Sequence, residues 1–310
     1  MRVLFWGTPE FATPALRALI GEGFDVVGAV TQPDRPVGRS RSALKRSPVK
    51  AIAEDEGLPV LQPERPRGDD FLAAVRALEP DISVVVAYGH ILPKAVIDLP
   101  PRGTVNIHGS LLPALRGAAP IQAAIRDGHT ETGVTIMRMV PALDAGPVIL
   151  QVRTPVLGDE TYGELALRLS ELGALALIEA LTLMDLGGVT ERPQDDSQAT
   201  LAPKIEREDA RIDWTRPAVA VARAIRAFDP KPGAWSMLRD LEVKLFGVRP
   251  AMDAEGAPGQ VMGIGERGAL IACGEGGVRV AYAHPAGKRR LAMLDWAQGR
   301  GIKVGDRFGQ

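Results

Sequence analysis

The sequence predicts two domains: an α/β domain built on a doubly wound parallel sheet, and a smaller C-terminal domain of short strands that form a β-barrel. The chain has 310 residues, 45% hydrophobic and 24% charged, a length and composition typical of two globular domains. Its first part alternates strand and helix patterns. Its last part consists of short strand patterns separated by glycine-rich turns.

The first part of the chain alternates short apolar runs with amphipathic stretches. The predicted strands are Arg2–Gly7, Asp25–Val30, Pro59–Leu61, Ile82–Ala87, Gly103–His108, Val134–Met139 and Val148–Pro155. The predicted helices are Pro14–Gly21, Lys50–Glu56, Asp69–Leu78, Ile121–Arg126 and a long one from Tyr162 to about Leu186, which opens with the capping box Thr161-x-x-Glu164. This alternation favours a Rossmann-like, doubly wound parallel sheet.

The second part begins after a polar stretch. Residues 189–206 are rich in polar side chains and contain Pro193, which is typical of a linker. A helix is predicted over Ala218–Phe228. Short strands are then predicted at Ser236–Asp240, Glu242–Val248, Gly259–Ile264, Ala269–Ala272 and Val278–Ala283. We therefore expect domains at residues 1–188 and 207–310, joined by the linker 189–206.

Composition excludes several classes of protein. No apolar run approaches the roughly 18 residues of a membrane span, and the N-terminal apolar stretch is too short for a signal peptide, so we expect a cytoplasmic protein without a membrane partner. The single cysteine, Cys273, excludes a disulfide framework and a thiolate-rich metal site. The four histidines have no metal-ligand spacing, so no metal is expected.

The formal net charge of −1 hides an uneven distribution. Residues 1–203 hold 19 basic and 25 acidic side chains, whereas residues 204–310 hold 18 basic and 13 acidic ones. This asymmetry indicates a polyanionic partner for the last part. Variation of surface charge without function is the alternative.

The turn after the first strand argues against a dinucleotide cofactor. A dinucleotide site needs the pattern G-x-G-x-x-G there, so that bare backbone approaches the pyrophosphate. This turn has one glycine, Gly7, and Pro9 removes a backbone donor. NAD is therefore not expected.

The most informative segment is Asn106-Ile107-His108-Gly109-Ser110. Asn106 and His108 are two residues apart on a predicted strand and point to the same side. They lie where that strand ends, which is where open α/β sheets bind ligands. An amide donor beside an imidazole suits a carbonyl oxygen that becomes an oxyanion. The alternative for His108 is a purely structural histidine.

A third polar group is needed to orient such a histidine. Asp144 lies in a predicted loop between small residues and is the candidate, although sequence spacing alone does not bring it near His108.

A predicted loop between Gln32 and Ser47 carries five basic side chains against one acid. They are Arg35, Arg39, Arg41, Lys45 and Arg46. Basic side chains on a loop that also contains glycine and serine are typical of phosphate contacts. A solvated loop without a partner is the alternative.

With these motifs together, the chain resembles the formyltransferases that use 10-formyltetrahydrofolate. The motifs that carry the resemblance are Asn106-x-His108, Ser110-Leu111-Leu112-Pro113-x-x-Arg116-Gly117, Thr132-Gly133-Val134-Thr135 and Leu143-Asp144-x-Gly146. Further motifs extend it over some 270 residues. These include Gly7-Thr8-Pro9-Glu10-Phe11 and Ala87-Tyr88-Gly89 in the first part, and Ile212-Asp213-Trp214 and Cys273-Gly274 in the second.

The resemblance implies the chemistry of formyl transfer to the methionine carried by initiator tRNA. Asn106 would donate a hydrogen bond to the developing oxyanion. His108 would stabilise the same oxygen as a cation or proton donor. Asp144 would favour the charged imidazole and relay protons, through a water.

The resemblance also implies two binding surfaces. The folate co-substrate would contact Ser110, Leu111, Leu112, Pro113, Tyr88, Gly89 and Ile91. Initiator Met-tRNA would contact the basic loop and the C-terminal barrel, which resembles an OB-like fold. The densest basic cluster of that barrel is Lys288-Arg289-Arg290. The family further implies a monomer.

Two other hypotheses remain. The same Asn-His-Asp chemistry serves formyltransferases that act on a sugar-nucleotide or purine-precursor amine, but these should lack the basic loop or the C-terminal barrel. A non-enzymatic RNA-binding module is the second, and it would have no use for Asn106, His108 and Asp144 together.

Overall fold

The computed structural model describes residues 1–37 and 43–309. It divides into two compact units whose boundaries do not follow the chain in one cut. Unit 1 comprises Met1–Gly117, Thr132–Thr154 and Ala166–Leu201. Unit 2 comprises Ala118–Glu131, Pro155–Leu165 and Ala202–Gln310. Each unit has its own sheet.

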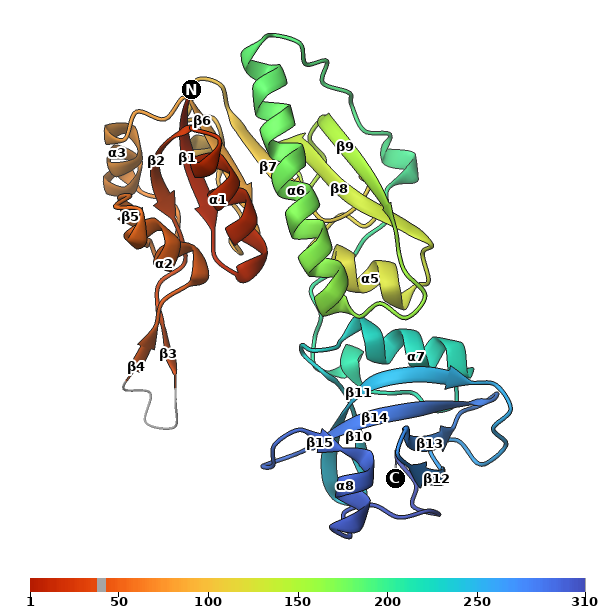
Figure 1. Cartoon of the computed structure of the whole chain (residues 1–310). Helices are drawn as coiled ribbons and strands as arrows, with labels where there is room; N and C mark the ends of the chain where they lie inside the picture. Colours follow the sequence, from red (N-terminus) through yellow and green to blue (C-terminus); the bar gives the residue numbers. More distant parts are fainter. Residues whose placement is uncertain (38–42, 310) are drawn as a thin grey trace. The chain divides into compact units, whose positions relative to one another are not determined.

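Unit 1 is built on a seven-stranded sheet with the order β5-β2-β1-β6-β7-β8-β9. Its strands are β1 (Arg2–Gly7), β2 (Asp25–Val30), β5 (Val60–Leu61), β6 (Ile82–Val86), β7 (Thr104–His108), β8 (Glu131–Arg138) and β9 (Val148–Pro155) (Figure 1). The strands from β5 to β7 are parallel, which confirms the prediction for that part. Strand β6 is buried throughout and apolar except for Ser83, because both faces of a parallel sheet are covered.

Strand β8 departs from the predicted parallel sheet, because it pairs antiparallel with β7. The connection from β7 to β8 carries only the seven-residue helix α5 (Pro120–Arg126). That helix belongs to unit 2, where it packs against α7 (Ala218–Ala227). No helix therefore carries the chain back along the sheet, and the next strand runs in the opposite direction.

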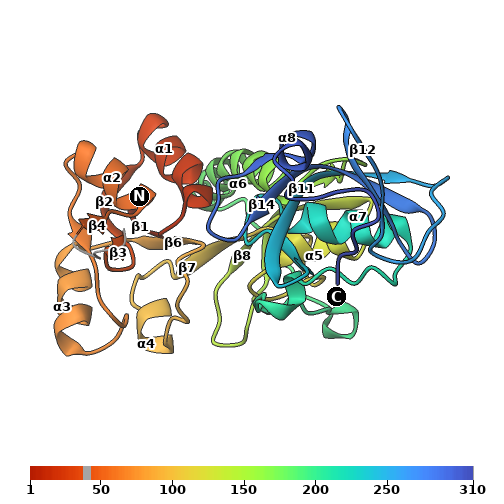
Figure 2. The same cartoon turned by 90° about the horizontal axis from the view of Figure 1, so that it is seen from below.

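Helices cover both faces of the parallel part of the sheet. In Figure 2, α1 (Thr13–Gly21) and α2 (Pro48–Asp55) lie on one face, and α3 (Asp69–Ala77) and α4 (Lys94–Ile97) lie on the other. On the α3 and α4 side, Trp6 and Leu4 of β1 pack in one buried cluster with Val75 and Val96. A short helix η1 (Glu10–Ala12) precedes α1, and α4 was not predicted.

The long helix α6 (Tyr162–Asp185) begins as the capping box predicts. The Thr161 backbone N–H donates to Oε2 of Glu164 (2.8 Å), and the Glu164 N–H donates to Oγ1 of Thr161 (3.3 Å). Gly173 lets α6 approach β7 closely, because a Cβ there would lie 2.9 Å from Cγ2 of Ile107. The helix thus packs directly behind the strand that carries Asn106 and His108.

The predicted basic loop is a hairpin in part. Strands β3 (Arg35–Val37) and β4 (Ala43–Lys45) pair antiparallel and form a separate two-stranded sheet. Each strand has only three residues, which is too short to give a strand pattern in the sequence. Arg39 and Arg41 lie outside the described residues.

Unit 2 contains an antiparallel sheet with the order β10-β11-β14-β13-β12, and β15 pairs with β14. Its strands are β10 (Ala234–Leu238), β11 (Leu241–Ala251), β12 (Val261–Gly265), β13 (Gly268–Ala272), β14 (Gly277–Pro285) and β15 (Leu291–Ala292). Short helices η3 (Glu208–Ala210) and α8 (Met293–Gln298) accompany α7. Strand β15 and helix α8 were not predicted.

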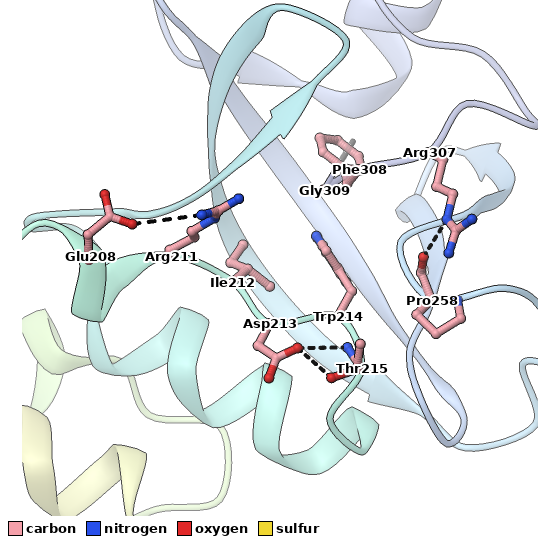
Figure 3. Close-up of a pocket in the computed structure, with 10 residues that line it drawn as sticks. All are labelled: Glu208, Arg211, Ile212, Asp213, Trp214, Thr215, Pro258, Arg307, Phe308 and Gly309. Carbon is pink, nitrogen blue, oxygen red and sulfur yellow. Dashed lines mark hydrogen bonds and ion pairs between the residues drawn. The ribbon is translucent and has the colours of Figure 1, made fainter.

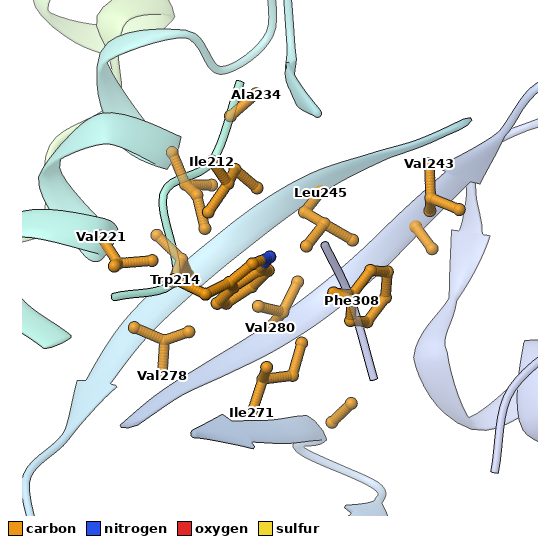
Figure 4. Packing of buried hydrophobic residues seen from close by; sticks show 14 of the residues in the cluster. Ile212, Trp214, Val221, Ala234, Val243, Leu245, Ile271, Val278, Val280 and Phe308 are labelled. Carbon is orange, nitrogen blue, oxygen red and sulfur yellow. The ribbon is translucent and has the colours of Figure 1, made fainter. Parts of the chain in front are cut away.

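One side chain cluster forms the core of unit 2. Figure 4 shows Trp214 and Phe308 packed with Leu245, Ile271 and Val280 from three strands. The rings of Trp214 and Phe308 lie 5.7 Å apart. Cys273 is also buried there, and burial raises the pKa of its thiol to about 11.

The regular pairing leaves this sheet open between its edge strands β10 and β12, so it is less closed than the predicted barrel. The end of the chain fills this opening. Leu238 of β10 forms a bridge with Phe308, and Gln260 beside β12 forms one with Arg307. The backbone N–H of Gly309 donates to Met237 (2.8 Å). Residues 307–309 therefore bridge the two edge strands, although this C-terminal segment has no strand pattern in the sequence.

No helix among the described residues is long and apolar enough to cross a membrane.

Candidate active site

Strand β7 carries Asn106 and His108 near its carboxyl end. The strand lies inside the sheet, parallel to β6 and antiparallel to β8. Residues two apart on a strand face the same side, so the two side chains share one face. The carboxyl ends of parallel strands are where open α/β sheets bind ligands. The fold therefore presents both side chains at a favourable position for chemistry.

His108 is almost fully buried, with 5% of its surface exposed. Its Nε2 lies 3.0 Å from the carbonyl oxygen of Leu115. Because a carbonyl oxygen only accepts, this hydrogen bond puts the ring proton on Nε2. Nδ1 lies 3.7 Å from Oδ2 of Asp144, which is too long for a hydrogen bond. Nδ1 is thus the ring nitrogen that can still receive a proton.

Burial lowers the pKa of His108 below its ordinary value of 6.5. The Asp144 carboxylate and the hydrogen bond to Leu115 act in the opposite direction, because both favour the charged ring. Burial is the largest of the three effects. The imidazole is therefore neutral at neutral pH and can accept a proton.

Asp144 is brought beside His108 by the loop between β8 and β9. Its Oδ2 accepts a hydrogen bond of 2.8 Å from the backbone N–H of Gly117. Its φ is +47°, in the left-handed region that non-glycine residues rarely adopt. The structure thus places Asp144, which sequence spacing alone could not bring near His108, beside the imidazole, with its carboxylate on the Nδ1 side.

The Asn106 side chain is partly buried. Within residues 1–37 and 43–309, its amide makes no hydrogen bond to another side chain or to the backbone. Polar side chains in folded proteins ordinarily bind protein or water. This amide is therefore available to donate to a substrate oxygen next to the imidazole.

The segment after β7 is fixed by hydrogen bonds to the neighbouring strands. Oγ1 of Thr135 on β8 donates to the Ser110 carbonyl (2.7 Å) and accepts from the Leu112 N–H (3.1 Å). Nε2 of Gln151 on β9 donates to the Leu112 carbonyl (2.7 Å). Sequence reasoning missed Gln151, which belongs to no motif. These hydrogen bonds hold the backbone of the residues expected to bind folate in one conformation.

The side chains expected to contact folate differ in exposure. Tyr88 is 1% exposed, packs edge-on against Trp6 and has no hydrogen-bond partner for its hydroxyl among the described residues. Burial raises the pKa of Tyr88 to about 12. Ile91 is 85% exposed, so it is accessible to a ligand whereas the Tyr88 ring is not. Ser110 and Leu112 are buried, and Leu111 and Pro113 are partly exposed.

The backbone around Tyr88 and Gly89 is tied to the base of the β3–β4 hairpin. The Tyr88 carbonyl accepts hydrogen bonds from Oγ1 of Thr8 (3.1 Å) and Nε2 of Gln32 (3.0 Å). Gly89 has φ +91°, and a Cβ there would lie 2.4 Å from Nε2 of Gln32. Nε2 of Gln62 in turn donates to the Gln32 carbonyl. This hydrogen-bond network has no sequence motif.

The base of the hairpin holds an internal ion pair that sequence reasoning missed. Nζ of Lys50 lies 2.6 Å from Oδ2 of Asp34 and 2.8 Å from Oε1 of Gln62. The hydrogen bond to Lys50 is the main reason that the pKa of Asp34 is lowered. The one acid of the basic loop is thus already paired within unit 1.

The basic side chains of the hairpin are not equally available. Arg35 donates to Oε1 of Gln32 (2.6 Å), and Arg46 forms an exposed ion pair with Glu54 (2.7 Å). Lys45 is exposed. Surface pairs of this kind are weak and can be exchanged for phosphate contacts.

The predicted cluster of unit 2 lies in the turn between β14 and β15. Lys288 and Arg289 are exposed. Arg290 is exposed as well, but its guanidinium stacks over the rings of Phe246 (4.2 Å) and Tyr282 (4.8 Å). Its guanidinium also lies 3.8 Å from Oδ1 of Asp229. All three members of the cluster are thus exposed, and only Arg290 also packs on aromatic rings of unit 2 among the described residues.

Unit 2 also has a hollow of about 460 Å³ that holds none of the predicted site residues. Figure 3 shows the residues that line it, which include the charged side chains of Arg211, Arg307, Glu208 and Asp213. Asp213 accepts hydrogen bonds from the Thr215 backbone and hydroxyl. The hollow is lined by side chains of both charges and by core residues such as Trp214 and Phe308. We assign no catalytic role to it.

The side chains that commonly bind metal ions are dispersed over the described residues. In the part of the chain that the structure describes, no three His, Cys, Asp or Glu side chains are arranged to hold one ion.

Comparisons with known proteins cover the whole chain. The family model described as formyl transferase matches residues 1–181, and the model described as formyl transferase, C-terminal domain, matches residues 204–301. A methionyl-tRNA formyltransferase of Magnetococcus marinus is 42% identical over 309 residues, covering 100% of this chain and 98% of that protein. One of Aromatoleum aromaticum is 46% identical over 308 residues, covering 99% and 97%.

Solved structures share the fold. HypX from Aquifex aeolicus, in complex with tetrahydrofolic acid, aligns with a TM-score of 0.69 at 21% identity. The alignment covers 99% of this chain, which spans half the length of that protein. With two family models covering both parts of the chain and relatives above 40% identity over its full length, the chain belongs to the formyl transferase family.

Proposed function

We propose that this chain transfers the formyl group of 10-formyltetrahydrofolate to the amino group of methionine on initiator tRNA, giving formyl-Met-tRNA and tetrahydrofolate for translation initiation. The observation that carries the proposal is the group of Asn106, His108 and Asp144, in a chain similar to methionyl-tRNA formyltransferases over its full length. A solved structure with a similar fold, WlaRD, is described as a sugar 3N-formyl transferase, so the experiment below compares acceptors.

The first role concerns the charge that develops on the formyl oxygen. As the methionine nitrogen bonds to the formyl carbon, the carbonyl electrons move to this oxygen, and they return when the bond from carbon to N10 of the folate breaks. The Asn106 amide has no partner among the described residues and would donate to the oxygen. Loss of one preorganised donor of this kind typically costs about 10²–10³ in the rate of acyl transfer.

The second role concerns the proton that the amine loses. His108 is neutral because burial lowers its pKa, and Nδ1 faces Asp144. Nδ1 would accept this proton while Asp144 stabilises the resulting imidazolium, and the charged ring would then stabilise the oxyanion. The proton finally goes to N10 of the leaving folate, which balances the reaction.

The remaining assignments follow the same proposal. Unit 1 would bind the folate near Ser110–Pro113, Tyr88–Gly89 and Ile91. The exposed cations Lys45, Lys288 and Arg289 support contacts to the phosphates of tRNA. We infer a catalytic domain over residues 1–188 and a tRNA-binding domain over 207–310, which residues 189–206 join, in a monomeric protein of the cytoplasm.

The test is an assay with alternative acceptors. The enzyme is incubated with 10-formyltetrahydrofolate and with either initiator Met-tRNA, free methionine or an amino-sugar nucleotide. We expect formylation of Met-tRNA alone at comparable concentrations. Formylation of the amino-sugar nucleotide with none on Met-tRNA would overturn the proposed acceptor but keep the chemistry of the site.

A further inference from the structure

Segment 194–201 follows α6 in unit 1 and contains the short helix η2 (Asp196–Gln198). Gln194 of this segment uses its whole side-chain amide. Nε2 donates to the carbonyls of Asp144 (2.8 Å) and Gly146 (2.7 Å). Oε1 accepts from Nε (3.1 Å) and Nη2 (2.8 Å) of Arg116. One side chain thus links the Asp144 loop to the loop that follows β7.

Thr200 holds the second of these loops. Its Oγ1 accepts from the backbone N–H of Leu115 (2.9 Å), and its carbonyl accepts from the N–H of Arg116 (2.8 Å). Leu115 is the residue whose carbonyl binds Nε2 of His108. The segment therefore reaches both groups that flank the imidazole: the Leu115 carbonyl on Nε2 and the Asp144 carboxylate on the Nδ1 side.

Both flanking residues have an unfavourable backbone conformation. Leu115 has φ +60° and Asp144 has φ +47°, so both are left-handed without being glycine. Such a conformation is unfavourable for a residue with a Cβ and persists only where the surroundings enforce it. The hydrogen bonds from Gln194 and Thr200 are placed to enforce it, because they bind the backbone of these two residues.

The buried Arg116 completes the arrangement. It is 9% exposed, and Nη2 also lies 2.7 Å from Oδ1 of Asp196 in the same segment. A buried guanidinium without acceptors would be costly. Gln194 and Asp196 supply those acceptors, so the segment is attached to the loop after β7 at three of its residues.

We propose that Gln194 and Thr200 are positioning residues for formyl transfer, which set the Asp144 carboxylate and the Leu115 carbonyl against the two ring nitrogens of His108. The inference rests on the proposed roles of His108 and Asp144. The segment would then belong to the catalytic apparatus of unit 1, although its composition predicts only a linker.

The first experiment measures kcat and KM for Met-tRNA formylation by Gln194→Ala, with Gln198→Ala as the matched control. Gln198 lies in the same segment and is exposed, and among the described residues it donates only to Asp195. We expect Gln194→Ala to lower kcat by about ten- to a hundredfold, since small displacements of catalytic groups have effects of that order. KM for both substrates should change less than about twofold, and Gln198→Ala should match wild type.

Conservative variants separate positioning from folding. Gln194→Glu keeps an acceptor for Arg116 but loses both donors to the Asp144 loop, so we expect a loss of kcat at least as large as that of Gln194→Ala, with KM for both substrates within about twofold of wild type. Thr200→Ser keeps the hydroxyl that accepts from Leu115, whereas Thr200→Val removes it. Thr200→Ser should therefore retain most of the rate that Thr200→Val loses, and equal rates would contradict the inference.

A double-mutant cycle with Asp144→Ala distinguishes the outcomes. If Gln194 acts through Asp144, Gln194→Ala should reduce the rate less than about threefold in the Asp144→Ala background. The same fold loss in both backgrounds, or wild-type kcat for Gln194→Ala beside a slow Asp144→Ala, overturns this inference and leaves the proposed function intact. A wild-type enzyme that cannot formylate Met-tRNA overturns both.

Discussion

The polar groups around His108 and the basic clusters of the β3–β4 hairpin and the β14–β15 turn are held in different ways. His108 is 5% exposed and lies between Leu115 and Asp144, both of which have a positive φ. Hydrogen bonds join the Leu115 carbonyl to the imidazole and the Asp144 carboxylate to the backbone of Gly117. In the clusters, Lys45, Lys288 and Arg289 are exposed, and Arg46 has only a surface ion pair. A site that must stabilise one transition state is preorganised, whereas a surface that meets a flexible polyanion needs charge more than geometry.

The largest effect is expected at β7. Asn106→Ala and His108→Ala should each lower the rate of Met-tRNA formylation by about 10²–10³, because each removes a group that acts on the formyl oxygen. The measurement is single-turnover formylation at saturating folate. Wild-type-like turnover in either variant would remove the basis of the site assignment.

A smaller effect is expected at the exposed cations of the β14–β15 turn. The double variant Lys288→Ala/Arg289→Ala should weaken tRNA binding and reduce the slope of log affinity against log salt by about 1 for each phosphate that the variant no longer neutralises. The rate at saturating tRNA should stay at the wild-type value. Arg267→Ala removes one positive charge from the β12–β13 turn and serves as the control. An unchanged salt slope in the double variant would show that this turn does not contact tRNA.

Arg290 differs from its neighbour Arg289 within the same cluster, because its guanidinium stacks on Phe246 and Tyr282. Arg290→Ala should lower the free energy of unfolding by about 1 kcal/mol, the usual size of a cation–π contact near the surface. The neighbouring Arg289→Ala should change it by less than about 0.5 kcal/mol. Urea unfolding of both variants measures the difference, and equal stabilities would mean that the stacking contributes nothing.

The smallest effect is a shift in pH dependence. Neutral His108 is the active form in the proposed mechanism, so the rate should fall on the acid side with a midpoint below 6.5, in line with the lowered pKa. Asp144 raises that pKa, and Asp144→Asn removes this contribution. The acid limb of the variant's remaining activity should therefore move to lower pH. A move to higher pH would contradict the assigned electrostatics.

Most of the fold could be predicted from local patterns. The capping box at Thr161 and Glu164 begins α6 as expected. The buried, mostly apolar run Ile82–Val86 is a parallel strand, as its composition predicts. The antiparallel direction of β8 could not be predicted, because it depends on α5 packing in unit 2 rather than on any residue of the strand. The bridge from Phe308 to β10 is likewise a contact between distant segments without a pattern of its own.

The sequence predicts which residues carry the chemistry of the site, but not the residues that hold them in place by hydrogen bonds. Asn106 and His108 reveal themselves by their spacing on a strand, but only the folded chain brings Asp144 within 3.7 Å of the imidazole. Gln194, Thr200 and Gln151 act through hydrogen bonds to backbone carbonyls and N–H groups. Such hydrogen bonds impose no sequence spacing, so a single sequence carries no signal of them.

The most direct test of the central claim is the single-turnover formylation rate of Asn106→Asp, measured with initiator Met-tRNA at saturating 10-formyltetrahydrofolate. The substitution is nearly isosteric, but it replaces a donor with a negative charge where the oxyanion would form. We predict a single-turnover rate about 10²–10³-fold lower than that of the wild type, with both substrates bound as tightly as before. A rate within tenfold of wild type would contradict the proposed role of this strand in catalysis.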